Sequence, residues 1–186
     1  MIHYCYVWDM DETLGCFVVL SDIINMLEEA MKRKIKQNEF HHVIDLFPEV
    51  LRPNIMEVLH YIKNNQHRNM HNIIYTNNNG PNWWCDHIAS YFDKRVGCKV
   101  FNKIIRAYEI DGTIVEKKRT SHLKRYDDLQ ACLNIKHPVN VCFIDDQDHD
   151  LHHHPNVSSY KIPPYVVTFK PKKVFDRLVD SKFYKY

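Results

Sequence analysis

The apolar and polar residues of the chain form short, β-prone runs separated by longer stretches with helical spacing. The short runs are rich in valine, isoleucine, tyrosine and phenylalanine, which favours strands. Strands are predicted at 3–8, 71–75, 139–144 and 157–162. Helices are predicted from Ser21 to residue 35, from Arg52 to residue 63, and over 82–95, 123–133 and 172–183.

Three further stretches follow these periods less clearly. Residues 15–19 are apolar and short, which favours a turn or a flap strand. Residues 40–51 are predicted to form a weaker helix or a loop. The turn signal Asp111-Gly112-Thr113 predicts a hairpin within 100–117.

Strands and helices alternate along most of the chain, which predicts an α/β fold. We expect a doubly wound, mainly parallel sheet with helices on both faces. The 186 residues fit one domain, with 16–51 as a small helical insertion within it. That insertion is too small for a large cap domain. The site should therefore be open, which suits a macromolecular substrate.

Polar side chains follow three of the predicted strands at the point where each strand ends. The carboxyl ends of parallel strands meet at one edge of a sheet, where sites form as the strand order switches. Three independent polar strand ends are difficult to explain by packing alone. The residues concerned are Asp9 and Asp11, Thr76 and Asn77, and Asp145 and Asp146.

Asp9 and Asp11 are separated by one residue, so in extended geometry both side chains would lie on one face at the carboxyl end of the first strand. Two carboxylates so close repel each other unless a cation or a shared proton compensates them. A solvated turn is the alternative interpretation. The chemical interpretation is covalent catalysis, with Asp9 as nucleophile and Asp11 as acid and base. A hard divalent cation would then hold both near a phosphate.

Composition limits the other classes of function. Lys and Arg number 25 and Asp and Glu 23, a net charge of +2 that is too small to argue for nucleic-acid binding. The six cysteines include no Cys-x-x-Cys pair, which predicts reduced thiols in an intracellular protein, cytoplasmic or nuclear. No run approaches the ~18 apolar residues of a membrane span. The histidines at 149 and 152–154 lack the spacing of a zinc site and are predicted to be solvated.

The sequence Asp-x-Asp-x-Thr after an apolar strand resembles the first motif of the haloacid dehalogenase (HAD) superfamily. Within it, Asp9-Met-Asp-Glu-Thr-Leu14 is similar to the Asp-Leu-Asp-Glu-Thr-Leu of phosphatases acting on the RNA polymerase II C-terminal domain (CTD), also called nuclear-LIM-interactor-interacting-factor-like phosphatases. Arg52-Pro53 before a helix also resembles that branch. Arg-Thr-x-x-x-Lys and Phe-Ile-Asp-Asp-Gln resemble HAD-like proteins of large DNA viruses. The resemblance covers roughly 3–15 and 52–165.

This resemblance implies roles at the strand ends. Asp9, Asp11, Asp145 and Asp146 would form the Mg²⁺ site, Asp11 through its backbone carbonyl and Asp146 by holding the loop or a metal-bound water. Thr13 would brace the first loop. Thr76 matches the serine or threonine of the second motif and would bind a phosphoryl oxygen with help from Asn77. An ST-turn or a helix N-cap is the alternative for Thr76.

The third motif needs a cation for the phosphoryl oxygens. Lys124 is the first choice, because it begins a predicted helix before the fourth strand, and Lys117 and Lys118 are competitors. The sequence departs from the CTD branch at two places, one expected to contact the phosphate and one expected to contact the rest of the substrate. The second loop reads Thr-Asn-Asn-Asn-Gly-Pro, and Gln147 follows the aspartate pair where serine is usual.

The function implied is Mg²⁺-dependent phosphomonoester hydrolysis, acting on phosphoserine or phosphothreonine of a protein or peptide. Two alternatives stay open. One is a nucleotide or nucleic-acid-end phosphatase, and the other is an interaction module with little activity. Trp83 and Trp84 could grip a peptide, although such a pair more often covers the core. The pattern indicates no membrane partner and leaves the oligomeric state undetermined.

Overall fold

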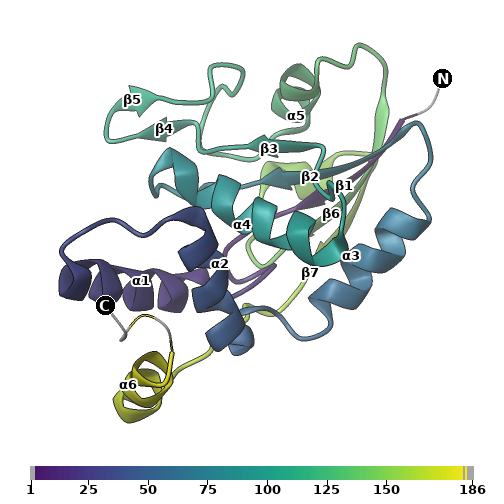
Figure 1. The fold of residues 1–186 in the computed structure, drawn as a ribbon. Helices are drawn as coiled ribbons and strands as arrows, with labels where there is room; N and C mark the ends of the chain where they lie inside the picture. Colours follow the sequence, from purple (N-terminus) through teal and green to yellow (C-terminus); the bar gives the residue numbers. More distant parts are fainter. Residues whose placement is uncertain (1–2, 182, 184–186) are drawn as a thin grey trace.

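A computed structural model describes residues 3–181 and 183, and its main sheet has five strands in the order β3-β2-β1-β6-β7 (Figure 1). All four pairings are parallel. The predicted α/β fold with a parallel sheet is therefore confirmed. The strands are β1 (His3–Trp8), β2 (Met70–Tyr75), β3 (Lys103–Ile105), β6 (Val139–Asp145) and β7 (Val157–Lys161).

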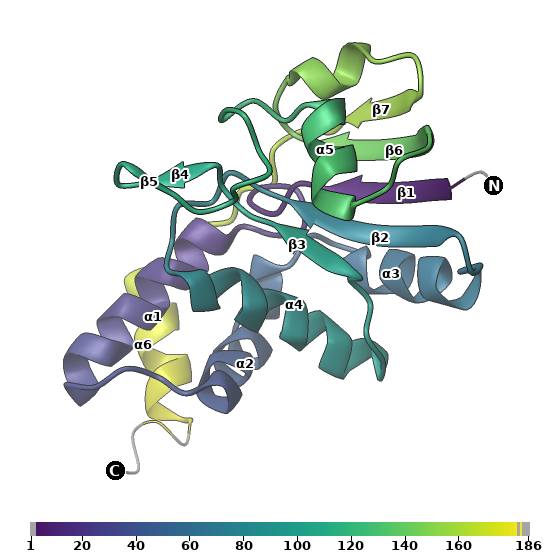
Figure 2. The same cartoon turned by 90° about the horizontal axis from the view of Figure 1, so that it is seen from above.

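Strand β1 lies at the centre of the sheet, with Trp8 opposite Ile74 of β2 on one side and Ile144 of β6 on the other. The chain passes from β1 through β2 to β3 on one side and later returns to β6 and β7 on the opposite side (Figure 2). The strand order thus reverses between β1 and β6. Such a reversal opens a crevice beyond the carboxyl ends of these strands.

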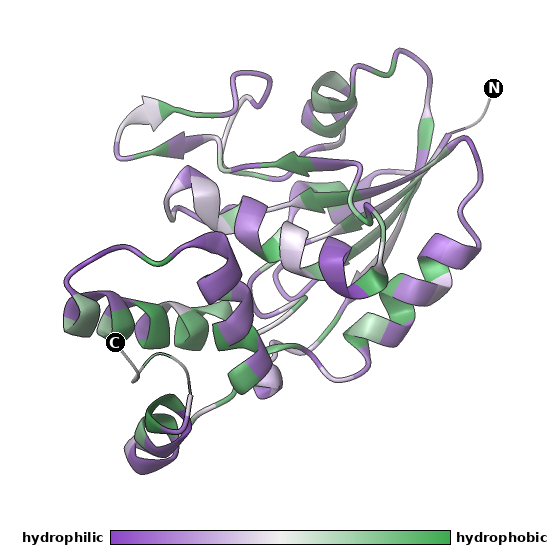
Figure 3. Cartoon of the chain, in the orientation of Figure 1, coloured by the Kyte–Doolittle hydropathy of each residue, from purple (hydrophilic) through white to green (hydrophobic). Residues whose placement is uncertain are grey.

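Helices cover both faces of the sheet, and alternate strand residues point to each. Trp8, Ile74 and Ile144 pack with the apolar residues of α1 to α4, whereas Val7 and Ile73 pack with those of α5 on the opposite face. Figure 3 shows apolar and polar residues mixed along the helices, with apolar residues also in the strands. The helices are α1 (Phe17–Met31), α2 (Gln37–Leu46), α3 (Ile55–Asn64), α4 (Asn82–Val96), α5 (Tyr126–Leu133) and α6 (Pro171–Val179).

The start of α1 corrects one prediction. Residues 15–19 form no flap strand, and the helix begins at Phe17 rather than near Ser21. Phe17 and Leu20 are fully buried and extend the apolar stripe of α1 backwards by one turn. Gly15 makes only isolated bridges, to Asp11 and Leu51. A Cβ on Gly15 would lie 2.5 Å from the carbonyl oxygen of Val50, so this close approach requires glycine.

The segment 40–51 is more regular than the sequence predicted. It contains most of α2 and the short 3₁₀ helix η1 (Pro48–Val50). Phe40, Val43 and Ile44 form the buried face of α2. Together with α1 and α6, these elements form a helical layer that extends beyond the edge of the sheet (Figure 2). The predicted helix at 172–183 ends earlier, at Val179, and its position 182 lies outside the described residues.

The stretch 100–117 divides between two sheets. Its first part, β3, joins the main sheet as an edge strand, and β4 (Glu109–Ile110) pairs antiparallel with β5 (Thr113–Ile114) as the predicted hairpin. Asp111 and Gly112 both have positive φ, at 49° and 76°, as a two-residue hairpin turn requires. Across the described chain, no helix has the length and apolar character needed to span a bilayer.

Candidate active site

A cavity of about 550 Å³ lies beyond the carboxyl ends of β1, β2 and β6, where the strand order reverses. The three polar strand ends seen in the sequence all line it. The first turns of α1 form its outer wall through Phe17, Val18, Ser21 and Asp22. The polar lining comprises Asp9, Asp11, Glu12, Thr76, Asn77, Asn78, Asn79, Lys124, Asp145, Asp146, Gln147 and His149.

Three carboxylates form the acidic centre of this cavity. One oxygen each of Asp9, Asp145 and Asp146 can be chosen so that all three lie within 4.8 Å of one another, and all three residues are buried. Oxygen ligands from carboxylates are those that hard divalent cations such as Mg²⁺ prefer. Uncompensated buried carboxylates repel each other, so this donor set fits a divalent cation both chemically and electrostatically.

Lys124 supplies the positive charge within reach of these groups. Its side chain is 1% exposed, and Nζ donates to Oδ1 of Asp9 and, at 2.7 Å, to Oδ2 of Asp145. One lysine against three carboxylates leaves the centre net negative. Lys124 lies two residues before α5 rather than inside its first turn. The backbone oxygen of Lys124 accepts from Leu151 N at 3.0 Å, which fixes this segment beside the loop after β6.

The carboxyl groups differ in their protonation. Burial raises the pKa of Asp9 to about 6; Lys124 opposes this effect and Asp145 adds to it. Burial would also raise the pKa of Asp145, but hydrogen bonds and charge from His149 and Lys124 outweigh it, so that this pKa is lowered. The carboxyl of Asp9 therefore ionises at a higher pH than a free aspartate, and that of Asp145 at a lower pH.

Asp11 differs from Asp9 and Asp145 in its partner. Its Oδ2 accepts from Nδ2 of Asn78 at 2.8 Å, and its carboxylate lies outside the group of three. Burial raises the pKa of Asp11 despite the bond from Asn78. A carboxyl group with a raised pKa at the rim of the cavity suits an acid and base catalyst. The contribution of its backbone carbonyl to a metal site stays a prediction.

The loop after β2 is ordered by its own side chains. Oγ1 of Thr76 accepts from Asn78 N at 3.0 Å, and Oδ1 of Asn78 accepts from Gly80 N at 2.9 Å. The first contact is the ST-turn that the sequence left open for Thr76. Thr76 is 1% exposed and lines the cavity next to Asn77. Its hydroxyl thus orders the loop and borders the cavity.

Arg119 is a buried cation whose role sequence reasoning missed. The guanidinium donates to the carbonyl of Thr76 at 3.1 Å, to Oδ1 of Asn77 at 2.7 Å and to the carbonyl of His122 at 3.0 Å. It also lies 4.8 Å from the ring centre of Tyr75. Arg119 therefore joins the loop after β2 to the segment that leads into Lys124. Its place in Arg-Thr-x-x-x-Lys was the available signal.

The competing lysines lie elsewhere. Lys117 and Lys118 are exposed, and neither lines the cavity. The expectation that Lys118 helps to bind phosphate is therefore not matched by its position. Arg119 takes the inward-facing position of this turn, because its fork can satisfy several backbone oxygens at once whereas lysine cannot.

Arg52 braces the loop that follows Asp9. Its Nε donates to the carbonyl of Thr13, and one terminal nitrogen donates to the carbonyl of Glu12, both at 2.6 Å. Glu12 has a φ of 57°, a conformation that non-glycine residues seldom adopt. Thr13 Oγ1 donates to Oδ1 of Asp146 at 3.3 Å. Thr13 thus connects the first loop to the loop after β6.

Two sequence interpretations of aromatic and histidine residues need adjustment. His149 is not solvated with its neighbours, because it lines the cavity with Nε2 3.5 Å from Oδ2 of Asp145. His154 stacks on Tyr126 with 3.6 Å between ring centres. Trp84 is a core residue, as favoured, and also borders the cavity. The two histidines lie on either side of the short 3₁₀ helix η2 (Asp150–His153), whose turn residue spacing does not predict.

Comparisons with known proteins add little to this geometry. No protein-family profile and no curated protein sequence matches the chain. Among solved structures, the chain is similar to magnesium-bound YfnB from Bacillus subtilis, which is described as a HAD-hydrolase. The identity is 11%, the match covers 92% of each chain, and the TM-score is 0.42. A likeness this distant shows neither the family nor the activity of the chain.

Proposed function

We propose that this protein is a HAD-type, Mg²⁺-dependent phosphomonoesterase that works through an aspartyl-phosphate. The observation that carries the proposal is the meeting of Asp9, Asp145 and Asp146 at the strand-order reversal, with Lys124 paired to Asp9 and Asp145. Structural ion pairs seldom place three buried carboxylates against one lysine, because the excess negative charge is costly. A site for a divalent cation and a phosphate accounts for that excess.

In the first step, a carboxylate oxygen of Asp9 attacks phosphorus and the ester P–O bond breaks. The leaving oxygen takes its proton from Asp11, whose raised pKa favours the protonated form that this step needs. In the second step, Asp11 accepts a proton from water as the water attacks phosphorus. Inorganic phosphate leaves, and the carboxylate of Asp9 and the proton on Asp11 are both restored.

Mg²⁺, when bound, would neutralise the phosphoryl oxygens and lower the pKa of Asp9. Asp9, Asp145 and Asp146 are the residues that would hold it. Lys124 contacts Asp9 and Asp145, so its ammonium lies where a phosphoryl oxygen on Asp9 would need a positive partner. Thr76 and Asn77 border the same space and would orient the phosphate.

The substrate we propose is a phosphoserine or phosphothreonine side chain in a protein or peptide. The cavity is walled by the first turns of α1 rather than closed by a cap, which leaves room for a chain to pass. The motifs at Asp9–Leu14 and Arg52-Pro53 favour the CTD phosphatase branch, and the resemblance to viral proteins is the weaker of the two. Acidic residues outnumber Lys124 around the cavity, which disfavours polyanionic nucleotides.

The test is hydrolysis of an aryl phosphate with and without Mg²⁺, comparing the native protein with Asp9→Asn. We expect phosphate release only with the divalent cation, and a loss of at least about 10³-fold in the variant. Asp127→Asn, an exposed carboxylate on α5, is the matched control and should keep full activity. Equal rates for the native protein and Asp9→Asn would refute the assignment.

A further inference from the structure

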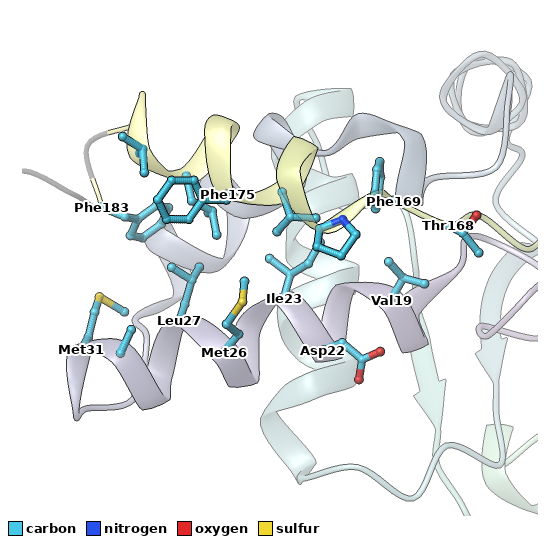
Figure 4. Close-up of a pocket in the computed structure, with 15 residues that line it drawn as sticks. Val19, Asp22, Ile23, Met26, Leu27, Met31, Thr168, Phe169, Phe175 and Phe183 are labelled. Atoms are coloured by element: carbon cyan, nitrogen blue, oxygen red, sulfur yellow. The ribbon is translucent and has the colours of Figure 1, made fainter.

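A second, apolar groove of about 760 Å³ lies between α1 and α6 (Figure 4). One wall comes from α1, including Val19, Ile23, Met26, Leu27 and Met31. The other comes from the C-terminal segment, including Phe169, Val174, Phe175, Leu178 and Val179. A groove of this size and apolar lining matches the usual dimensions of a ligand site.

Ion pairs on one side of α6 fix its position and leave the groove open. Glu49 accepts from Arg177 at 2.7 and 2.8 Å and from Lys173 at 2.9 Å, and Arg177 also donates to the carbonyl of Leu46. None of the residues of α6 is buried, although the structure describes the whole helix. Phe175 is 63% exposed. Val174 and Leu178 pack partly against the main core, so the apolar stripe of α6 is covered in part and Phe175 is left open to a partner surface.

The groove and the candidate active site share one lining residue, Asp22. This residue lines both the catalytic cavity and the groove, and Figure 4 shows it at the edge of the groove, on the side of α1 away from α6. Asp22 is exposed, and its side chain has no hydrogen bond or ion pair with any residue that the structure describes. Its neighbour Val18 is 58% exposed on the cavity side. A molecule that fills both spaces therefore passes a free carboxylate.

We propose that the groove binds an apolar side chain of a phosphorylated peptide whose phosphorylated residue occupies the catalytic cavity. The proposal rests on the function proposed above and names the substrate more closely. Asp22 lies between the two spaces and would pair with a lysine or arginine of the same peptide. An unpaired carboxylate beside an apolar groove favours a basic and apolar peptide over an anionic lipid surface, which it would repel.

The spacing along α1 sets the spacing in the peptide. Residues 17–22 border the cavity and residues 19–31 border the groove, so the two centres are about five or six residues apart. At about 1.5 Å per helical residue this is ~8 Å along the axis of α1, and the peptide must also cross the helix, which is ~10 Å wide with its side chains. An extended peptide covers the axial distance in about two or three residues and the path across α1 in about four. The apolar side chain should therefore stand two to four positions from the phosphorylated residue.

The experiment uses phosphoserine peptides of a fixed alanine-rich sequence with one leucine at each position from two to four on either side. We expect one leucine position to raise kcat/KM about tenfold over the all-alanine peptide. Met26→Glu, at a residue 45% exposed in the groove wall, should reduce the ratio of kcat/KM between the leucine and all-alanine peptides to near one. Tyr61→Glu, on the exposed face of α3, is the matched control and should preserve it.

A lysine placed next to the phosphoserine should raise kcat/KM further, and Asp22→Asn should remove that gain. A ratio near one at every leucine position in the native protein would overturn the proposal. The proposal would also be overturned if the native protein were a dimer that Met26→Glu converts to a monomer. It would equally be overturned if the native protein bound phosphatidylserine vesicles and Met26→Glu abolished that binding. If the aryl phosphate is not hydrolysed, the proposed phosphatase function is refuted whatever the groove binds. Peptide affinity for Asp9→Asn, measured by fluorescence anisotropy, then shows separately whether the groove binds leucine.

Discussion

Lys124 and Asp145 are joined by a 2.7 Å hydrogen bond between side chains that are 1% and 0% exposed. They are 21 positions apart in the chain and come from a loop and a strand end. The same ammonium also donates to Asp9. This shared contact brings the first and last polar strand ends together around one cation.

Replacing Lys124 with methionine should remove activity and leave two buried carboxylates without their partner. We expect kcat/KM for an aryl phosphate to fall at least about 10²-fold. Without divalent cations, the free energy of unfolding should fall by about 3–5 kcal/mol, as when one partner of a buried ion pair is lost. Lys118→Met should leave both kcat/KM and the free energy of unfolding nearly unchanged. If Lys118→Met is the more damaging variant, the assignment of the cation is wrong.

The raised pKa of Asp9 predicts a pH dependence of stability in the absence of metal. The folded pKa of about 6 exceeds the usual 3.8, so the folded state holds a proton that the unfolded state has released. Stability should therefore fall as pH rises from about 4 to about 6. Asp145, whose pKa is lowered, contributes in the opposite direction. Comparing native protein and Asp9→Asn by thermal unfolding in EDTA isolates the Asp9 contribution, and identical pH profiles would contradict it.

Arg119 should act as a positioning residue. Arg119→Lys keeps the charge but cannot reach the carbonyl of Thr76, Asn77 and the carbonyl of His122 together. We expect kcat to fall about 10- to 100-fold, with a smaller change in KM, because Lys124 and the loop after β2 lose their alignment. Steady-state kinetics with matched circular dichroism spectra tests this. Unchanged kcat in a folded Arg119→Lys variant would refute the role.

The docking of α6 should depend on Glu49. Hydrogen bonds from Arg177, followed by those from Lys173, lower the pKa of Glu49 to about 2 although burial opposes them. Its stabilising effect should be complete above pH 4.5 and lost as pH falls through about 2. At neutral pH, Glu49→Gln should speed tryptic cleavage after Lys173 and Arg177, whereas Glu57→Gln should not. Equal cleavage rates would show that other contacts hold the helix.

Sequence reasoning succeeded where one local pattern determines structure. The apolar runs before Asp9, Thr76 and Asp145 are long enough to identify strands, and parallel pairing places their carboxyl ends at one edge. The Asp111-Gly112 turn was likewise readable, because few residues adopt positive φ. The fold class and the convergence of the polar strand ends could therefore be predicted before any coordinates were known.

The features of the site that the sequence did not predict depend on contacts between distant segments. Arg119 gains its role only when its loop folds against the end of β2, and Asn78 reaches Asp11 across 67 positions of sequence. His149 faces Asp145 because η2 turns the chain back towards the site. Lys124 was placed at the start of a helix, whereas α5 begins two residues later. Propensity and spacing carry no information on such tertiary contacts.

The most direct test of the account is chemical trapping of the intermediate. The protein is mixed with an aryl phosphate and Mg²⁺, quenched during turnover and reduced with borohydride, which converts an aspartyl-phosphate to homoserine. Peptide mass spectrometry then locates the reduced residue. The account predicts homoserine at position 9 and none in the Asp9→Asn variant. Turnover with homoserine at another aspartate, or with no trapped residue at all, would contradict it.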